Sequence, residues 1–168
     1  CTKGELSDIA ARFMSNLAKC DESVTSRLVV ENEDKGCWTV DNLLRHFNIP
    51  ITFDNLHDKC NPSETSSEDC MYQCAATWNV RPLFHYSESH PDKTNPRSHA
   101  DMPVDKPCSE QYDWDIELKS KDAAIRACMV PTYDIGASMD WRLKYAGDAR
   151  WDVFGRAAAF GEIKNEKD

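Results

Sequence analysis

The chain has 168 residues, of which 40% are hydrophobic and 29% are charged, and its formal net charge is -9. This length fits one domain but falls short of the roughly 250 residues of a complete (β/α)8 barrel. No apolar run approaches the roughly 18 residues of a membrane span, so we expect no membrane partner. The acidic excess argues against a protein that wraps duplex DNA with a basic surface, although bound metal ions can still attract a polyanion.

The start of the chain and its cysteines bear on the compartment. The chain begins at Cys1, without an apolar signal segment or an Arg-rich presequence. We therefore expect a fragment or a processed product, and its first residues do not indicate a cellular compartment. Several of its eight cysteines lie in predicted helices or strands, which favours free thiols over an extracellular disulfide framework.

Predicted helices and strands alternate along the first half of the chain. Apolar residues at helical spacing predict an amphipathic helix over residues 6–17. The apolar run 27–31 predicts a buried strand. Thr39 is expected to cap a helix over residues 40–47, and residues 51–54 predict the next strand.

The same alternation continues through the second half. Thr65 and Glu68 have the spacing of a capping box, which predicts that a helix begins there and runs to Trp78. Residues 82–87 and 114–118 predict strands on either side of a long polar loop, and residues 123–129 predict a helix. Strands and helices that alternate with short connections predict parallel βαβ units, and therefore an α/β fold.

Side chains of metal-ligand type recur where each predicted strand ends. Because the carboxyl ends of parallel strands share one edge of a sheet, we expect these side chains to converge. Three histidines and three carboxylates suit zinc, manganese or iron and can hold two or more ions. Taken singly, each could instead be an ion-pair partner, a core histidine or a solvated side chain. The six candidates are Glu31, Asp54, His57, His85, His99 and Glu117.

The long loop after the third strand is locally neutral in an acidic chain. Four Lys and Arg balance four Asp and Glu between residues 81 and 106. Arg81, Lys93 and Arg97 are therefore candidates for phosphate contact, and a solvated surface loop is the alternative.

Several motifs, in matching order and spacing, resemble those of the UV-damage endonuclease family. The resemblance runs from about residue 9 to residue 125. The motifs are LVVENEDK at 28–35, TFDNLH at 52–57, ATW at 76–78, HYSE at 85–88, SHAD at 98–101 and DIELKSKD at 115–122.

The resemblance implies a metal-dependent DNA repair endonuclease that nicks the strand 5′ of a lesion in damaged duplex DNA. Position by position, the six candidates match metal ligands, with catalytic roles for Glu31, His85 and Glu117. Lys119 and Lys121 would steady the anion. The implied cofactors are two or more divalent ions, foremost Mn²⁺, with Mg²⁺ or Zn²⁺ as alternatives, and the implied location is the nucleus or another DNA-containing compartment.

The resemblance also implies a fold, the C-terminal half of a (β/α)8 TIM barrel with about four strands. We expect residues 1–129 to form this half and residues 130–168 to form a tail that carries no motif. Leu83 stands where some family members carry a lysine that becomes carboxylated near the metals.

Half of a barrel would leave two open sheet edges and an apolar inner face without partners. An N-terminal half, a homodimer partner or the aromatic tail would have to cover them; the tail aromatics are Trp141, Trp151, Phe154 and Phe160. Two other functions remain open: a metal-dependent sugar isomerase on the same type of barrel, and a half-barrel remnant that is not catalytic and needs a partner chain.

Overall fold

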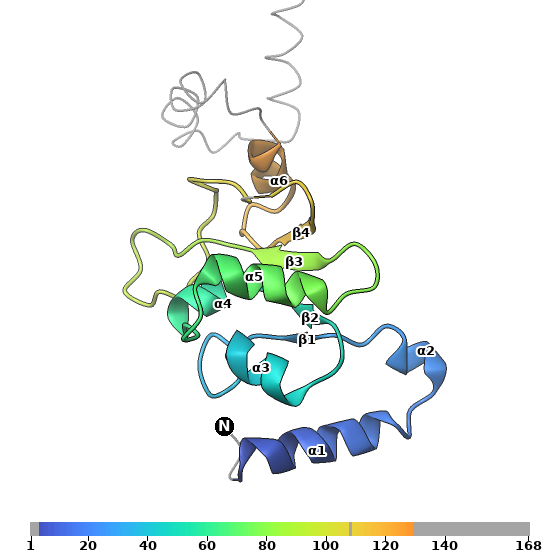
Figure 1. The fold of residues 1–168 in the computed structure, drawn as a ribbon. Helices are drawn as coiled ribbons and strands as arrows, with labels where there is room; N and C mark the ends of the chain where they lie inside the picture. The colour runs from blue at the N-terminus through green and yellow to red at the C-terminus, as the bar shows by residue number, and fades with distance from the viewer. Residues whose placement is uncertain (1–3, 108, 130–168) are drawn as a thin grey trace, which may run out of the picture.

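Four short parallel strands lie next to one another in chain order, with helices between the first three and a long loop between the last two (Figure 1). The computed structural model describes residues 4–107 and 109–129. The elements are α1 (Leu6–Leu17), α2 (Glu22–Thr25), β1 (Val30–Glu31), α3 (Val40–His46), β2 (Ile51–Thr52), α4 (Asn55–Cys60), α5 (Ser67–Ala76), β3 (Leu83–Tyr86), β4 (Asp113–Ile116) and α6 (Asp122–Cys128). The predicted α/β class with parallel strands is confirmed.

Two parallel ladders and one bridge join the strands. Strand β1 pairs with β2 with Val30 opposite Ile51, and β3 pairs with β4 with Leu83 opposite Asp113. An isolated parallel bridge between Asp54 and His85 connects the two ladders. The strands therefore follow the order β1-β2-β3-β4, and their carboxyl ends share one edge.

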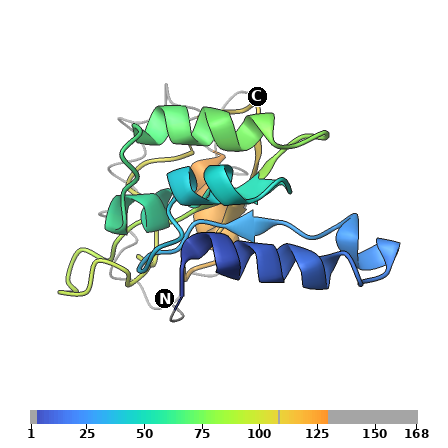
Figure 2. The same cartoon turned by 60° about the horizontal axis from the view of Figure 1, so that its bottom comes forward.

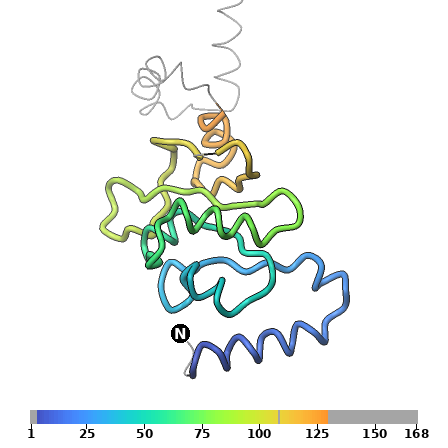
Figure 3. Tube along the Cα trace, in the orientation of Figure 1, coloured from blue at the N-terminus to red at the C-terminus, as the bar shows by residue number. Residues whose placement is uncertain are grey.

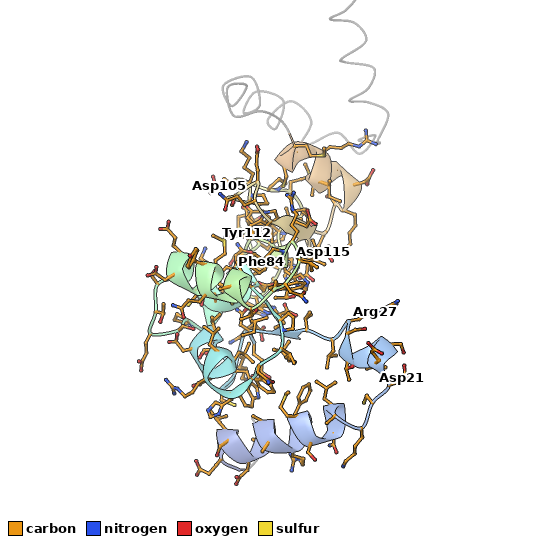
Figure 4. All side chains as sticks on the ribbon, turned by 45° about the vertical axis from the view of Figure 1, so that its right-hand side comes forward. Asp21, Arg27, Phe84, Asp105, Tyr112 and Asp115 are labelled. Carbon is orange, nitrogen blue, oxygen red and sulfur yellow. The ribbon has the colours of Figure 1, made fainter. Side chains whose placement is uncertain are left out.

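Helices α1, α3 and α5 form a layer along one side of the strands, and they keep this order in both views (Figures 1 and 2). The main core lies beneath this layer, where Val40, Ile51 and Phe84 are completely buried. Phe84 also packs against Tyr112, with ring centroids 4.9 Å apart (Figure 4). Burial of these side chains stabilises the positions of the strands relative to the helices.

A smaller core lies at the other end of the sheet and anchors the long loop. The tube in Figure 3 shows residues 88–107 leaving the sheet after β3 and returning before β4. Ala100 from this loop is buried with Tyr86, Ile116, Leu118 and Ala124. The loop is therefore part of the fold at the sheet's carboxyl edge.

The sheet face opposite the helices is not the apolar surface expected of an uncovered half-barrel. Alternation along the strands places Phe84 and Trp114 in the helix-side core and turns their neighbours the other way. Those neighbours include His85, Asp113 and Asp115, whereas Leu83 is the large apolar residue on this part of the face and is 42% exposed. Within the described residues, these polar side chains therefore leave less apolar surface to cover than an apolar inner face would.

The structure corrects several local predictions. Helices α2 and α4 were not predicted, and β1 has two residues where five were expected. The capping box is displaced by one residue: Ser66, not Thr65, accepts a hydrogen bond from the backbone N–H of Asp69. Thr65 lies in the segment before the cap, where the carboxylate of Asp41 accepts hydrogen bonds from the backbone N–H groups of Glu64 and Thr65.

The prediction of free thiols is confirmed in part. The thiols of Cys20, Cys60, Cys70 and Cys74 are free, as favoured, but Cys37 is disulfide-bonded. No helix in residues 4–107 or 109–129 combines the length and apolar composition that a membrane span requires. The expected tail and its aromatic side chains lie outside the described residues.

The displaced capping box can be tested with a matched pair of variants. Ser66→Ala should lower the free energy of unfolding by about 0.5 to 2 kcal/mol, because helix α5 loses its N-cap acceptor. Thr65→Ala keeps the backbone bond to Asp41 and should change stability by less than about 0.5 kcal/mol. Urea unfolding measures both, and a larger loss for Thr65→Ala would contradict the position of the cap.

Candidate metal centre

Acidic and histidine side chains meet at the carboxyl edge of the sheet. Glu31 is the last residue of β1, and Asp54 follows β2 as the N-cap of helix α4. His85 lies in β3, and Glu117 follows β4. Consecutive strands thus each contribute a side chain, as expected where parallel strands end together.

Glu31, Asp54 and His85 form the tightest group, because one potential ligand atom from each lies within 4.8 Å of the others. The Nδ1 atom of His85 is 3.0 Å from Oε1 of Glu31 and 3.9 Å from Oδ2 of Asp54. It is also 3.5 Å from Oε1 of Glu117. The imidazole of His85 therefore lies where three carboxylates converge.

His57 joins this group from helix α4, an element that the sequence analysis did not predict. Its Nδ1 atom is 3.3 Å from Oε1 of Glu31 and 2.8 Å from the backbone oxygen of Asn32. Its Nε2 atom is 4.0 Å from Oδ2 of Asp54. The D-x-x-H spacing brings the two side chains together because Asp54 caps the helix that carries His57.

His99 reaches the same edge from the long loop. Its Nδ1 atom is 2.7 Å from the backbone oxygen of Glu117, and an antiparallel bridge to Ser89 holds its backbone. The structure thus places His99 beside the segment that carries Glu117. Neither residue belongs to the tight group formed by Glu31, Asp54 and His85, although Glu117 contacts His85.

Asp54 carries the clearest signature of a cation site. The residue is completely buried, and its Oδ1 atom accepts the backbone N–H of His57 at 2.7 Å. Its Oδ2 atom is also buried but has no hydrogen-bond partner. An unpaired buried carboxylate oxygen is costly unless a cation neutralises it, and burial accordingly raises the pKa of Asp54.

The electrostatics of the other residues in this acidic and histidine group also favour a positive charge at the site. Burial alone would raise the pKa of Glu31, but hydrogen bonds and charges from His57 and His85 lower it to about 2. The hydrogen bond with Glu31 is the main reason why the pKa of His57 rises to about 9, and the same carboxylate raises the pKa of His85. Protonated imidazoles at His57 and His85 would supply positive charge beside these carboxylates.

The basic candidates divide between the two ends of the sheet. Lys119 and Lys121 follow Glu117 and are exposed. Lys93 lies close to Lys119, and this proximity lowers the pKa of Lys119. Two neighbouring amino groups near the carboxylate edge suit a phosphate group.

The two arginines have protein partners. Arg81 precedes β3, where its guanidinium contacts the backbone oxygen of Glu110 at 2.7 Å and Asp113 at 2.8 Å, at the sheet end opposite the acidic group. Arg97 is 3.1 Å from a carboxylate oxygen of Asp34 and ties the long loop to the segment after β1.

Two buried or half-buried asparagines at this edge were missed by the sequence analysis. Asn32 is 2% exposed and contacts the backbone of Asp54 with its side chain, and Asn55 contacts the backbone of Ser87. The available signal was their position, because each directly follows an acidic candidate ligand. Sequence position alone does not reveal these contacts, which depend on the spacing of neighbouring strands.

Comparisons with known proteins identify the family of this chain. Residues 1–140 match the family described as UV-endonuclease UvdE. The UV-damage endonuclease of Neurospora crassa is 32% identical over 144 residues, covering 73% of this chain and 22% of the relative. The UV DNA damage endonuclease of Bacillus pumilus is 29% identical over 138 residues, covering 73% of this chain and 43% of the relative.

A solved structure extends the agreement to the fold. The crystal structure of SacUVDE superimposes with a TM-score of 0.63 at 29% sequence identity, covering 74% of this chain and 45% of that one. The chain therefore spans less than half the length of each of these relatives. On the family match over residues 1–140, the chain belongs to the UV-endonuclease UvdE family.

Proposed function

We propose that this chain provides a metal centre for a DNA repair endonuclease that nicks the phosphodiester backbone 5′ of a lesion. The observation that carries the proposal is the buried, unpaired Oδ2 atom of Asp54, which faces Glu31 and His85. The UV-damage endonucleases among its relatives supply the reaction class. The same comparisons favour this function over the sugar isomerase considered from sequence.

Glu31, Asp54 and His85 are the residues that would hold a divalent ion, and His57, His99 and Glu117 extend the set toward a second one. Carboxylate and imidazole ligands together suit Mn²⁺, with Mg²⁺ or Zn²⁺ as alternatives. When bound, such an ion polarises a phosphodiester and lowers the pKa of a water molecule. Glu31, His85 and Glu117 are the proposed catalytic residues, because they would hold the ion beside the reacting phosphodiester.

Lys93, Lys119 and Lys121 are the proposed phosphate contacts. Lys93 and Lys119 adjoin each other on segments that also carry His99 and Glu117, so a phosphate between the two lysines would lie near the metal ligands. We leave Arg81 out of this set because its guanidinium binds Asp113 at the opposite end of the sheet. Arg97 acts on DNA only indirectly, by holding the loop through Asp34.

We further propose that residues 1–129 form half of a TIM barrel. Within the described residues, β1 pairs with β2 alone and leaves its other edge without a strand. Further strands along that edge would close the barrel and add the rest of the DNA-binding surface. The proposal fits the 45% share of SacUVDE that the chain covers.

The metal ligands can be tested by substitution. Glu31→Gln and His85→Ala should each weaken Mn²⁺ binding by about 100-fold or more, since losing an outer partner alone costs about 10- to 100-fold. Titration calorimetry on the 168-residue chain measures this affinity. In a chimera in which this chain replaces the matching part of the Bacillus pumilus relative, the same variants should lose lesion-dependent nicking of a duplex oligonucleotide.

Glu68→Gln is the matched control, because Glu68 lies in the exposed first turn of α5. It should leave both affinity and nicking unchanged. Mn²⁺ affinity that stays at the level of the unsubstituted chain in Glu31→Gln and His85→Ala would contradict the ligand assignment. If the unsubstituted chain binds no Mn²⁺ at all, the non-catalytic alternative replaces the proposal.

The pH dependence of the metal-free chain follows from His57. Because its folded-state pKa is raised from 6.5 to about 9, protonated His57 stabilises the fold below about pH 6.5, and this contribution is lost as the pH rises through 9. With solvent screening, we expect the free energy of unfolding to fall by about 1 to 2 kcal/mol over that window. Mn²⁺ affinity should rise over the same window, since the ion competes with the proton.

Urea unfolding with a chelator present measures this dependence, and His57→Ala should reduce the fall. His46→Ala is the control, because His46 lies in α3 beside Trp38 and outside the acidic group. An equal fall in the unsubstituted chain and in His57→Ala would show that another group is responsible.

A further inference from the structure

The side chain of Asn32 makes two hydrogen bonds to the backbone of Asp54, which follows the next strand, β2. Its Nδ2 atom donates to the backbone oxygen of Asp54 at 3.0 Å, and its Oδ1 atom accepts the backbone N–H of Asp54 at 2.8 Å. Asn32 is 2% exposed, and Asp54 is completely buried. The pair is therefore shielded from water, where hydrogen bonds restrict motion most strongly.

Asn55 repeats this arrangement one strand further along. Its Nδ2 atom donates to the backbone oxygen of Ser87 at 3.0 Å, and its Oδ1 atom accepts the backbone N–H of Ser87 at 2.9 Å. Each asparagine directly follows an acidic candidate ligand, Asn32 after Glu31 and Asn55 after Asp54. The same Asp/Glu-Asn pair thus occurs at the ends of two consecutive strands.

The geometry of the amide explains why asparagine stands at these positions. A side-chain amide carries N–H donors and an acceptor oxygen in one plane, as a peptide group carries one of each, so it can replace a peptide in a ladder. The β1–β2 ladder ends at Glu31 opposite Thr52, two residues before Asp54. The Asn32 side chain therefore extends the pairing of β1 and β2 to the level of the candidate ligands.

Asn32 also acts on His57. Its backbone oxygen lies 2.8 Å from Nδ1 of His57, while the backbone N–H of His57 donates to Asp54. With Nδ1 bonded to a backbone oxygen, the Nε2 atom remains for another partner, and it lies 4.0 Å from Oδ2 of Asp54. One residue thus contacts two candidate ligands, each through a separate group.

We propose that Asn32 and Asn55 are positioning residues, which set the distances between metal ligands on consecutive strands. The inference rests on the proposed function, because the ligands that the asparagines position are those of the proposed metal centre. Asn32 fixes the positions of Asp54 and His57 relative to Glu31. Asn55 sets the end of β3, which carries His85, relative to Asp54.

Mn²⁺ affinity of the 168-residue chain tests the proposal without an activity assay. By titration calorimetry, Asn32→Ala and Asn55→Ala should each weaken Mn²⁺ binding by about 10- to 100-fold, the usual effect of removing a group that orients a ligand. Asn42→Ala is the matched control: its Nδ2 atom donates to the backbone oxygen of Cys37 in a similar bond, but Asn42 contacts no candidate ligand. Asn42→Ala should stay within about twofold of the unsubstituted chain.

Asn32→Asp provides a second variant of nearly the same shape. It keeps an acceptor for the backbone N–H of Asp54 but loses the donor to its carbonyl oxygen, so Mn²⁺ binding should still weaken by about tenfold or more. Circular dichroism and urea unfolding with a chelator present identify any variant that is unfolded. A purely structural role would lower stability in all four variants without separating Asn42→Ala from the others in affinity.

The outcomes separate this inference from the function on which it rests. If the unsubstituted chain binds no Mn²⁺, the proposed function fails. If the unsubstituted chain binds Mn²⁺ and the folded Asn32→Ala, Asn32→Asp and Asn55→Ala variants bind it equally well, the proposed function stands and the positioning role is overturned.

Discussion

The arrangement of the whole carboxyl edge depends on the buried carboxylate of Asp54. One of its oxygens caps helix α4, and the other is left without a hydrogen bond inside the protein. Removing a carboxylate from water has a large free-energy cost, which a nearby positive charge offsets. The imidazoles of His57 and His85 lie beside this carboxylate and their pKa values are raised, and in the proposed metal-bound state a divalent ion would supply part of the positive charge.

The rest of the fold holds this unfavourable cluster in place. The helix-side core around Val40, Ile51 and Phe84 positions the strands, and the smaller core around Leu118 attaches the loop that brings in His99. Stability from these cores permits a group of like-charged carboxylates that would repel one another in a flexible chain. Among the described strands none pairs with the other edge of β1, which leaves room for the further strands of the proposed barrel.

Sequence patterns predicted the features that depend on local periodicity. The spacing of apolar residues located α1 over residues 6–17, and ligand-type residues at strand ends predicted the meeting of Glu31 and Asp54. Helix α4 was missed because only six residues form it, and Asp54 was assigned to a strand instead of a cap. The role of Arg81 at the opposite end was hidden because its partner Asp113 lies far along the chain.

Anomalous diffraction at the manganese edge, from crystals of the chain grown with Mn²⁺, tests the central claim most directly. The account predicts an anomalous peak among Glu31, Asp54 and His85, with Oδ2 of Asp54 bound to the ion. A folded chain whose Mn²⁺ peaks lie elsewhere, with Oδ2 of Asp54 still unbound, would contradict it.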